Sequence, residues 1–334
     1  MKRLCTATLL LTMLLSSGCE NRPKQYERTQ ELFGTFVSAR IFASDEKTAE
    51  AALDAAFRRA AELEQTFSPT IADSELNAVN AAAFSQETAV SEEFSELLGL
   101  SLRYSQLSGG AFDCSIGQLI DLWDIGTEQA TIPTDEELHR TIHPAAHEVI
   151  SLQDRSVRFT DERVRLHFGA IAKGYIADEM KEVLQAHGIE SGTLSLGGNI
   201  LTLGCKNEDE PWVIGITDPF APQEITATLE VRDLSVVTSG RYERYFEENG
   251  VTYHHILDPW TGLPSDAGLA SATIISQSSV QCDALSTAVF VLGAQEGLAL
   301  IEGLDGAECV LITDDGTLLQ SSGMDAYHVK QVEK

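Results

Sequence analysis

Two oxygen-bearing side chains, Asp283 and Thr287, stand four positions apart in an apolar segment of the chain. On an α-helix, residues at this spacing lie on the same face. A carboxylate and a hydroxyl suit a hard cation such as Mg²⁺, which also keeps waters and substrate phosphate oxygens in its shell. The segment also fits a simpler interpretation, in which Asp283 only caps the helix.

A second group of residues surrounds a glycine-rich turn, Phe168-Gly169-Ala170-Ile171-Ala172-Lys173-Gly174-Tyr175. A turn of this kind between a strand and a helix presents backbone groups to a phosphate, and the Lys173 ammonium could reach one. The segment lacks the G-K-[ST] ending of a Walker motif. It therefore indicates phosphate binding only in combination with other features.

The third group follows a predicted strand that ends in Ser239-Gly240, where a ligand can approach the backbone closely. His254 and His255 follow, with Asp258 three residues further on. A histidine near a carboxylate can act as a general base, although a structural His–Asp turn fits equally well. The two histidines are unsuited to sharing a metal, because adjacent strand residues point to opposite faces.

The fourth group is the loop Gly109-Gly110-Ala111-Phe112-Asp113. In such a loop, Phe112 could stack on a planar heterocycle and Asp113 could form a hydrogen bond with it.

The elements that position these residues follow from hydrophobic periodicity and from turn signals. Helices are expected at 45–66, from Ser91 to Gly109, at 174–187, from Asp283, and at 294–303. Strands are expected at 35–42, 193–197, 211–217, 224–238, 251–257 and 270–276, with two more in 148–168 around a turn at Asp161-Glu162 and a hairpin at 308–321. This irregular alternation predicts α+β or mixed α/β layers, not a doubly wound parallel sheet.

The chain is strongly acidic, with 23 basic and 51 acidic residues and a net charge of −28. This balance argues against nucleic acid as a partner, because backbone phosphates require neutralising Lys and Arg. A phosphate-bearing substrate would need a local cation as a shield, whereas the acidity could also serve solubility alone. None of the six cysteines belongs to a C-x-x-C pair, and we expect those at 114, 205, 282 and 309 to be mostly free thiols.

The N-terminus is typical of an export signal. Lys2 and Arg3 precede an apolar run over 5–15, which is too short to span a bilayer, and Gly18-Cys19 follows. We expect 1–18 to be a lipoprotein signal peptide, Cys19 to carry lipid, 19–31 to be a tether and 32–330 to form the folded domain. The expected location is the periplasm, anchored to a membrane through the acyl chains. The alternative is a secreted protein with an incidental cysteine.

Six ordered blocks together resemble the ApbE family of flavin transferases, from about Leu32 to about Leu292. They are Phe33-Gly34-Thr35; Phe67-Ser68 with Asp73-Ser74-Glu75-Leu76 and Asn80; Gly110-Ala111-Phe112-Asp113 with Trp123; Gly169-Ala170-Ile171-Ala172-Lys173-Gly174 with Asp178; Ser239-Gly240 and His255-Ile256-Leu257-Asp258-Pro259 with Thr261-Gly262 and Pro264; and Asp283-Ala284-Leu285-Ser286-Thr287.

The resemblance implies the family fold, with mixed sheets flanked by helices, and a set of site residues. The metal ligands would be the Ala170 carbonyl, Asp283 and Thr287, holding Mg²⁺, with Mn²⁺ as the alternative. His255 would be the acid–base residue. The expected FAD contacts are Phe33, Thr70, Ala111, Phe112, Asp113, His167, Lys173, Ser239, Gly240 and the backbone near Leu257.

The activity implied by the resemblance is transfer of FMN from FAD to a threonine of a partner flavoprotein, with release of AMP. Water as the acceptor would instead make the chain an FAD pyrophosphatase, and a lipoprotein that binds FAD without chemistry is a further alternative. Thr70, His167 and Ser286 depart from the residues usual in the family. The small side chain of Thr70 would admit water more easily than a tyrosine, which favours hydrolysis beside transfer.

Overall fold

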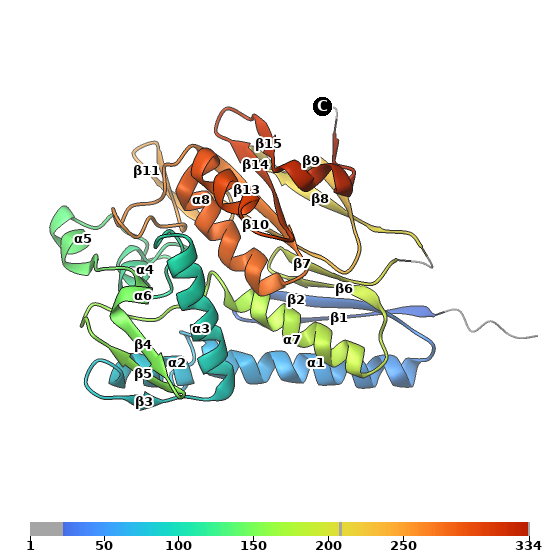
Figure 1. Cartoon of the computed structure of the whole chain (residues 1–334), viewed down its shortest axis with the longest axis horizontal. Coiled ribbons are helices and arrows are strands. Elements are labelled where there is room, and N and C mark those ends of the chain that lie inside the picture. Colours follow the sequence, from blue (N-terminus) through green and yellow to red (C-terminus); the bar gives the residue numbers. More distant parts are fainter. Residues whose placement is uncertain (1–22, 207–208, 333–334) are drawn as a thin grey trace, which may run out of the picture.

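The computed structural model describes residues 23–206 and 209–332. The expected signal peptide and Cys19 lie outside this part of the chain. The predicted α+β class is confirmed, because the chain forms sheets whose named strand pairs are all antiparallel, together with separate helical layers (Figure 1).

The largest sheet has eight strands in the order β1-β2-β6-β7-β10-β13-β14-β15. Their bounds are β1 Lys24–Leu32, β2 Thr35–Ala43, β6 Ser191–Leu196, β7 Asn199–Leu203, β10 Ser235–Gly240, β13 Leu269–Ser276, β14 Ala307–Thr313 and β15 Leu318–Gln320. All eight residues of β13 are buried, so this strand lies at the centre of the molecule.

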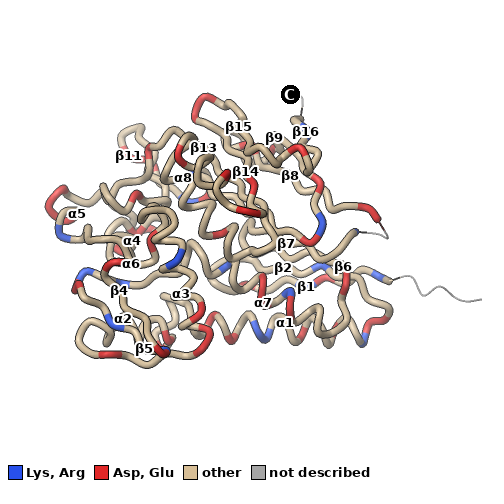
Figure 2. The backbone as a smooth tube through the Cα atoms, viewed as in Figure 1, with Lys and Arg blue, Asp and Glu red and all other residues tan. Residues whose placement is uncertain are grey.

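One face of this sheet is covered by three helices, α1 Glu46–Phe67, α7 Ala172–Ala186 and α8 Ser279–Glu302. The apolar side chains between these helices and the strands form the main hydrophobic core. Charged residues of both signs recur along α1 (Figure 2). Burial of the apolar faces is the main force that fixes the helices on the sheet.

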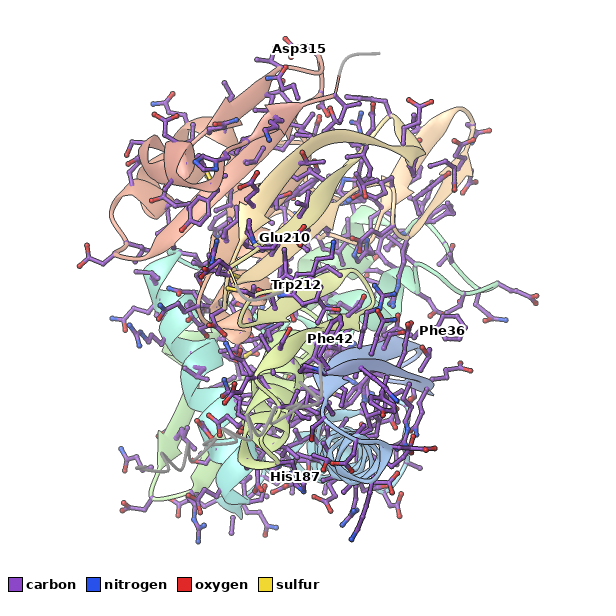
Figure 3. The ribbon with its side chains drawn as sticks, turned by 90° about the vertical axis from the view of Figure 1, so that its right-hand side faces the viewer. Phe36, Phe42, His187, Glu210, Trp212 and Asp315 are labelled. Carbon is purple, nitrogen blue, oxygen red and sulfur yellow. The ribbon has the colours of Figure 1, made fainter. Side chains whose placement is uncertain are left out.

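The other face of the sheet meets a three-stranded sheet, β16-β9-β8, formed by Lys330–Gln331, Ala221–Val231 and Trp212–Asp218. A short 3₁₀ helix, Ser322–Tyr327, packs beside it. Phe42 of β2 and Trp212 of β8 join the two sheets, with ring centroids 6.2 Å apart (Figure 3). This second layer has its own apolar cluster, which includes Ile216 and Val236.

The remaining elements form a lobe beside the large sheet (Figure 1). They are α2 Glu75–Ala82, β3 Thr88–Ala89, α3 Glu92–Leu107, α4 Gly117–Trp123, α5 Asp135–Thr141, α6 Ala146–Val149, β4 Ile150–Gln153 and β5 Ser156–Phe159. A hairpin of β11 Tyr245–Glu248 and β12 Val251–His254 packs against α4 through Trp123 and Tyr253.

Helix α8 is, by length and composition, apolar enough to cross a membrane, and it is the one such helix in the described chain. It packs instead against α7, β10, β13 and β14, as a core helix of a globular domain does. The positive φ of Gly293, 78°, divides it, which explains why the sequence suggested two helices.

Several expected boundaries were wrong. Residues 24–31 do not form a tether, because they belong to β1, which pairs with β2 along its whole length. The expected strand at 224–238 is two strands, β9 and β10. In 148–168 the turn lies at Asp154-Arg155, where both residues have positive φ, and not at Asp161-Glu162.

Candidate functional site

Asp283 lies one turn after a tight contact between α7 and α8, at Gly174 and Ser279. A Cβ on Gly174 would sit 2.3 Å from the Ser279 carbonyl oxygen, so only glycine allows this contact. Asp283 does not cap its own helix, because Ser278 is the N-cap of α8. Its Oδ2 instead accepts a hydrogen bond of 2.9 Å from the Gly174 amide, at the start of α7.

The Lys173 ammonium faces the same carboxylate, with 3.3 Å between Nζ and Asp283 Oδ1. It also donates to the Gly169 carbonyl at 3.0 Å. Asp283 is only 3% exposed, whereas Lys173 is partly exposed. A buried carboxylate thus holds a cation at the positive end of α7, where a phosphate would be attracted.

Of the other two expected metal ligands, Thr287 lies on α8 with Asp283, and Ala170 lies in the turn before α7. Thr287 is one turn further along α8, with its Oγ1 3.5 Å from Ser239 Oγ. The Gly174 amide donates to Asp283 instead of to the Ala170 carbonyl, and that carbonyl accepts no hydrogen bond from the described residues. A carboxylate, a hydroxyl and an available carbonyl are all oxygen donors, so these residues fit Mg²⁺.

A different kind of metal centre finds no support in the described residues. No group of three or more His, Cys, Asp or Glu side chains there could hold a metal ion. The cysteines at 114, 205, 282 and 309 are free thiols, as expected. A cation at Asp283 would therefore have one protein carboxylate and several neutral oxygen ligands, which is typical of Mg²⁺ that also binds substrate phosphates.

His167 is held as a neutral imidazole. Its Nδ1 accepts the Gly169 amide at 3.2 Å, which leaves the proton on Nε2. Burial and the nearby positive charges of Arg244 and Lys173 lower the pKa of His167 to about 4. The Asn80 amide fixes the preceding residue, Leu166, through hydrogen bonds to both its N–H and its carbonyl.

His255 is also neutral, but it is the other tautomer, with the proton on Nδ1. Its Nδ1 lies 3.3 Å from the Arg244 carbonyl and can only donate to it, so Nε2 is free to accept a proton. Burial, and then the positive charge of Arg244, lower its pKa to about 3. Leu257 follows in a bridge to Pro264, which fixes the backbone of this loop.

The expected stacking by Phe112 and hydrogen bonding by Asp113 are wrong for this structure. Phe112 is 1% exposed and packs on Tyr104 in the core. Both Asp113 oxygens are used internally, by Ser115 and by the Ala146 amide. The loop, which includes buried Ala111, can offer a ligand only its backbone.

Two further expected residues have no hydrogen bond to the group around Lys173 and Asp283. The Phe33 amide, at a positive φ of 54°, donates to Glu64 Oε1 at 2.5 Å, and its ring packs against the main core. Thr70 is exposed, and its hydroxyl lies 3.0 Å from Ser68 Oγ. Their contact with FAD remains a prediction.

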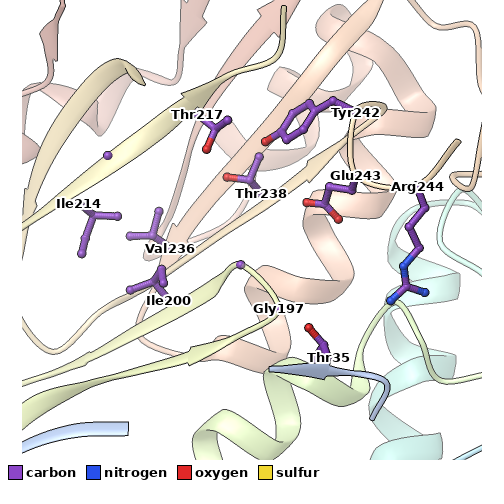
Figure 4. Close-up of a pocket in the computed structure, with 12 residues that line it drawn as sticks. Thr35, Gly197, Ile200, Ile214, Thr217, Val236, Thr238, Tyr242, Glu243 and Arg244 are labelled. Carbon is purple, nitrogen blue, oxygen red and sulfur yellow. The ribbon is translucent and has the colours of Figure 1, made fainter. Parts of the chain in front are cut away.

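Two candidate site residues, Glu243 and Arg244, were not predicted from the sequence. Glu243 and Arg244 line a cavity of about 420 Å³, directly after the Ser239-Gly240 strand end (Figure 4). Limited hydration raises the pKa of Glu243 to about 7, while the positive charges of Lys173 and Arg244 oppose that rise. The sequence does carry a signal for them, because Glu243 and Arg244 are adjacent charged residues shortly after the strand that ends at Gly240.

The chain is similar to several known proteins. A sequence profile described as the ApbE family matches residues 33–311. An FAD:protein FMN transferase from Treponema pallidum is 36% identical over 327 residues, covering 92% of this chain and 90% of that protein. Another, from Klebsiella pneumoniae, is 32% identical over 300 residues and covers 89% and 92%.

Solved structures agree with this relationship. The crystal structure of the ApbE protein from Thermotoga maritima has a TM-score of 0.83 and 29% identity, covering 93% of this chain and 100% of that one. The flavin transferase ApbE from Vibrio cholerae has a TM-score of 0.81 and 28% identity, covering 91% and 99%. On the extent of the profile match and of these alignments, the chain belongs to the ApbE family.

Proposed function

We propose that this protein transfers FMN from FAD to a threonine of a partner flavoprotein and releases AMP. The observation that carries the proposal is the Lys173–Asp283 pair at the start of α7, beside Thr287 and Ser239. It combines a phosphate-binding cation with oxygen donors for a metal. Two relatives that align over nine-tenths of their length are named FAD:protein FMN transferase.

The Ala170 carbonyl, Asp283 and Thr287 would hold Mg²⁺, with Mn²⁺ as an alternative that prefers the same donors. When bound, the ion neutralises the diphosphate and stabilises the charge on the departing AMP. Lys173 adds a second positive charge on the same group. Ser239, at the end of β10, lies next to Thr287, so Ser239 and Gly240 would lie near the bound diphosphate.

The acceptor hydroxyl requires a proton acceptor. The neutral His255 offers Nε2, since its Nδ1 is engaged by the Arg244 carbonyl. Its low pKa reflects burial first and then the positive charge of Arg244, and a bound diphosphate would offset that charge and raise its basicity. The hydroxyl oxygen then forms a bond to the FMN phosphorus, the bond to AMP breaks, and the proton moves to His255.

Hydrolysis is the second candidate function, with water in place of the threonine. It is favoured by the exposure of Thr70, an expected FAD contact, because a small exposed side chain there would admit water. The same metal and the same cationic groups would serve both reactions.

Chromatography of the reaction products distinguishes these functions. The domain without residues 1–19 is incubated with FAD and Mg²⁺, with and without a threonine-bearing acceptor. AMP with FMN bound to the acceptor supports the transferase, and AMP with free FMN in both samples supports the pyrophosphatase. Intact FAD in both samples would contradict enzymatic activity and leave a flavin-binding protein.

We further propose that lipid on Cys19 anchors the protein to a membrane in the periplasm. The proposal rests on Lys2, Arg3, the apolar run and Gly18-Cys19. Because β1 begins at Lys24, the segment between the lipid and the folded domain would be shorter than the sequence suggested. The domain would therefore work close to the membrane surface.

A further inference from the structure

The cavity beside Glu243 lies between β8, β10 and the turn that joins β6 to β7 (Figure 4). Its charged lining is confined to one end, at Glu243 and Arg244. The rest of the lining is neutral, with aliphatic side chains such as Ile214 and hydroxyls such as Thr217. Its volume of about 420 Å³ is in the usual range of ligand sites.

Two strands that border this cavity have backbone N–H and C=O groups along one edge that pair with no described strand. β8 is the edge strand of the smaller sheet, and both Ile214 and its neighbour Gly215 line the cavity. Consecutive strand residues point to opposite faces, so two neighbours cannot both reach one cavity through their side chains. Since both line this cavity, the backbone of β8 between them is accessible from it. The ladder between β10 and β7 ends at Val236, so residues 237–240 pair only with β13 among the described strands.

The charged end of the cavity adjoins the proposed reaction site. Glu243 lines the cavity, and its ionisation responds to the charges of Lys173 and Asp283. The Arg244 carbonyl holds His255, while the Arg244 side chain points toward the cavity. A molecule that occupied the cavity would therefore present one end to the phosphates and to His255.

We propose that this cavity binds an extended segment of the acceptor protein and delivers its hydroxyl to the FMN phosphorus. The inference rests on the proposed function and names the acceptor's place in that site. An extended peptide pairs with open strand edges through its backbone, and neutral side-chain pockets supply specificity. The diphosphate of FAD has its own cationic partner in Lys173, which does not line the cavity.

The reaction balances with the residues already placed. The oxygen of the acceptor hydroxyl forms a bond to the FMN phosphorus, and the bond between that phosphorus and the AMP oxygen breaks. The hydroxyl proton moves to His255 Nε2, and AMP leaves with the bridging oxygen. No oxidant or further reactant is needed.

Two substitutions on β8 provide a matched test. Ile214→Trp fills the cavity, whereas Val213→Trp adds the same side chain at the neighbouring position, which is 60% exposed and does not line it. Thr217→Phe is a second filling variant, in case Ile214→Trp fails to fold.

The probe is a fluorescein-labelled, capped seven-residue peptide with one central threonine between small aliphatic residues. Fluorescence polarisation measures its affinity, and FAD affinity and cleavage are measured in the same samples.

We expect the filling variants to weaken peptide binding at least tenfold and to leave FAD affinity and cleavage within twofold. Val213→Trp should match the parent in all three measurements. Equal peptide affinity in every variant, or no affinity in the parent, would overturn the inference. So would a loss of FAD affinity in the filling variants, which would assign the cavity to FAD. If the parent binds the peptide but leaves FAD intact, the proposed function fails and the cavity assignment stands.

Discussion

Asp283 combines a structural contact with the proposed metal contact, and substitution can separate the two. We predict that Asp283→Asn stays folded, because the amide oxygen can still accept the Gly174 amide. Loss of the negative charge should lower metal affinity at least tenfold, about 1.4 kcal/mol, and abolish FAD cleavage. Mn²⁺ binding followed by electron paramagnetic resonance, with circular dichroism for folding, checks both parts. Asp315→Asn, on an exposed turn, is the control.

The carboxyl of Glu243 changes its charge near neutral pH. Its carboxyl has a pKa of about 7, so it is neutral below that pH and negative above it. The negative form repels the FAD diphosphate, and we predict that FAD affinity falls as the pH rises from about 6 to 8. The neutral Glu243→Gln should show a flat profile. His167 and His255, with pKa values of about 4 and 3, stay neutral over this range.

A parallel decline in Glu243→Gln and the parent would contradict this assignment. The measurement is a titration of FAD fluorescence at fixed ionic strength, since screening changes the repulsion between charges.

The sequence predicted the relative placement of residues where spacing along one element decides which of them meet. Asp283 and Thr287 lie on one helix, and their separation alone placed them together. It failed for Phe112 and Asp113, because a local string cannot show that a ring is buried and that a carboxylate is used by Ser115 and Ala146. It also missed Glu243, whose environment depends on Lys173, 70 positions earlier.

At the scale of elements, the start of α8 is fixed by a residue of α7. Asp178 accepts the Ser279 amide at 2.9 Å and the Val280 amide at 3.0 Å. We predict that Asp178→Ala lowers the free energy of unfolding by about 1–3 kcal/mol, because it leaves two helix amides unpaired. Metal affinity should fall as well, since α8 carries both Asp283 and Thr287.

Asp45→Ala is the matched control for this prediction. Asp45 caps α1 by accepting the Thr48 amide at 3.0 Å, so its loss should also lower the free energy of unfolding. It is far along the chain from the proposed metal ligands and should leave metal affinity unchanged. Denaturant unfolding and Mn²⁺ titration of both variants compare the two effects, and equal metal affinity in both would contradict the positioning role of Asp178.

The elements found from sequence are those with a strong apolar period. Helices α1, α3 and α7 were located within a few residues, because their buried faces recur at helical spacing. β1 was missed because it is a polar edge strand with one buried residue among nine. The turn at Asp154-Arg155 was missed because neither position carries the glycine that usually marks positive φ.

At the scale of the whole molecule, the proposed lipid anchor and the flavin chemistry are separable. We predict that Cys19→Ser moves the protein from the membrane fraction to the soluble periplasmic fraction, because the acyl chains are lost. FAD cleavage by the purified protein should be unchanged, since the described domain begins after that residue. Fractionation followed by immunoblotting checks the first part, and retention of Cys19→Ser in the membrane fraction would contradict the anchor.

The net charge of −28 makes the local cations of the site important. Lys173 and Arg244 lie in a molecule whose overall field repels anions such as FAD. The charge map shows acidic residues spread over the exterior (Figure 2). Positive charge therefore has to be concentrated where the diphosphate binds, which is what the Lys173 site and a metal would supply.

The central claim is that this one site moves FMN from FAD onto a protein hydroxyl. The most direct test is intact-mass spectrometry of a threonine-bearing acceptor after incubation with the protein, FAD and Mg²⁺, with AMP quantified in the same sample. We predict a mass increase equal to FMN minus water, one AMP for each modified acceptor, and neither product with Asp283→Asn. An unmodified acceptor together with intact FAD would contradict the claim.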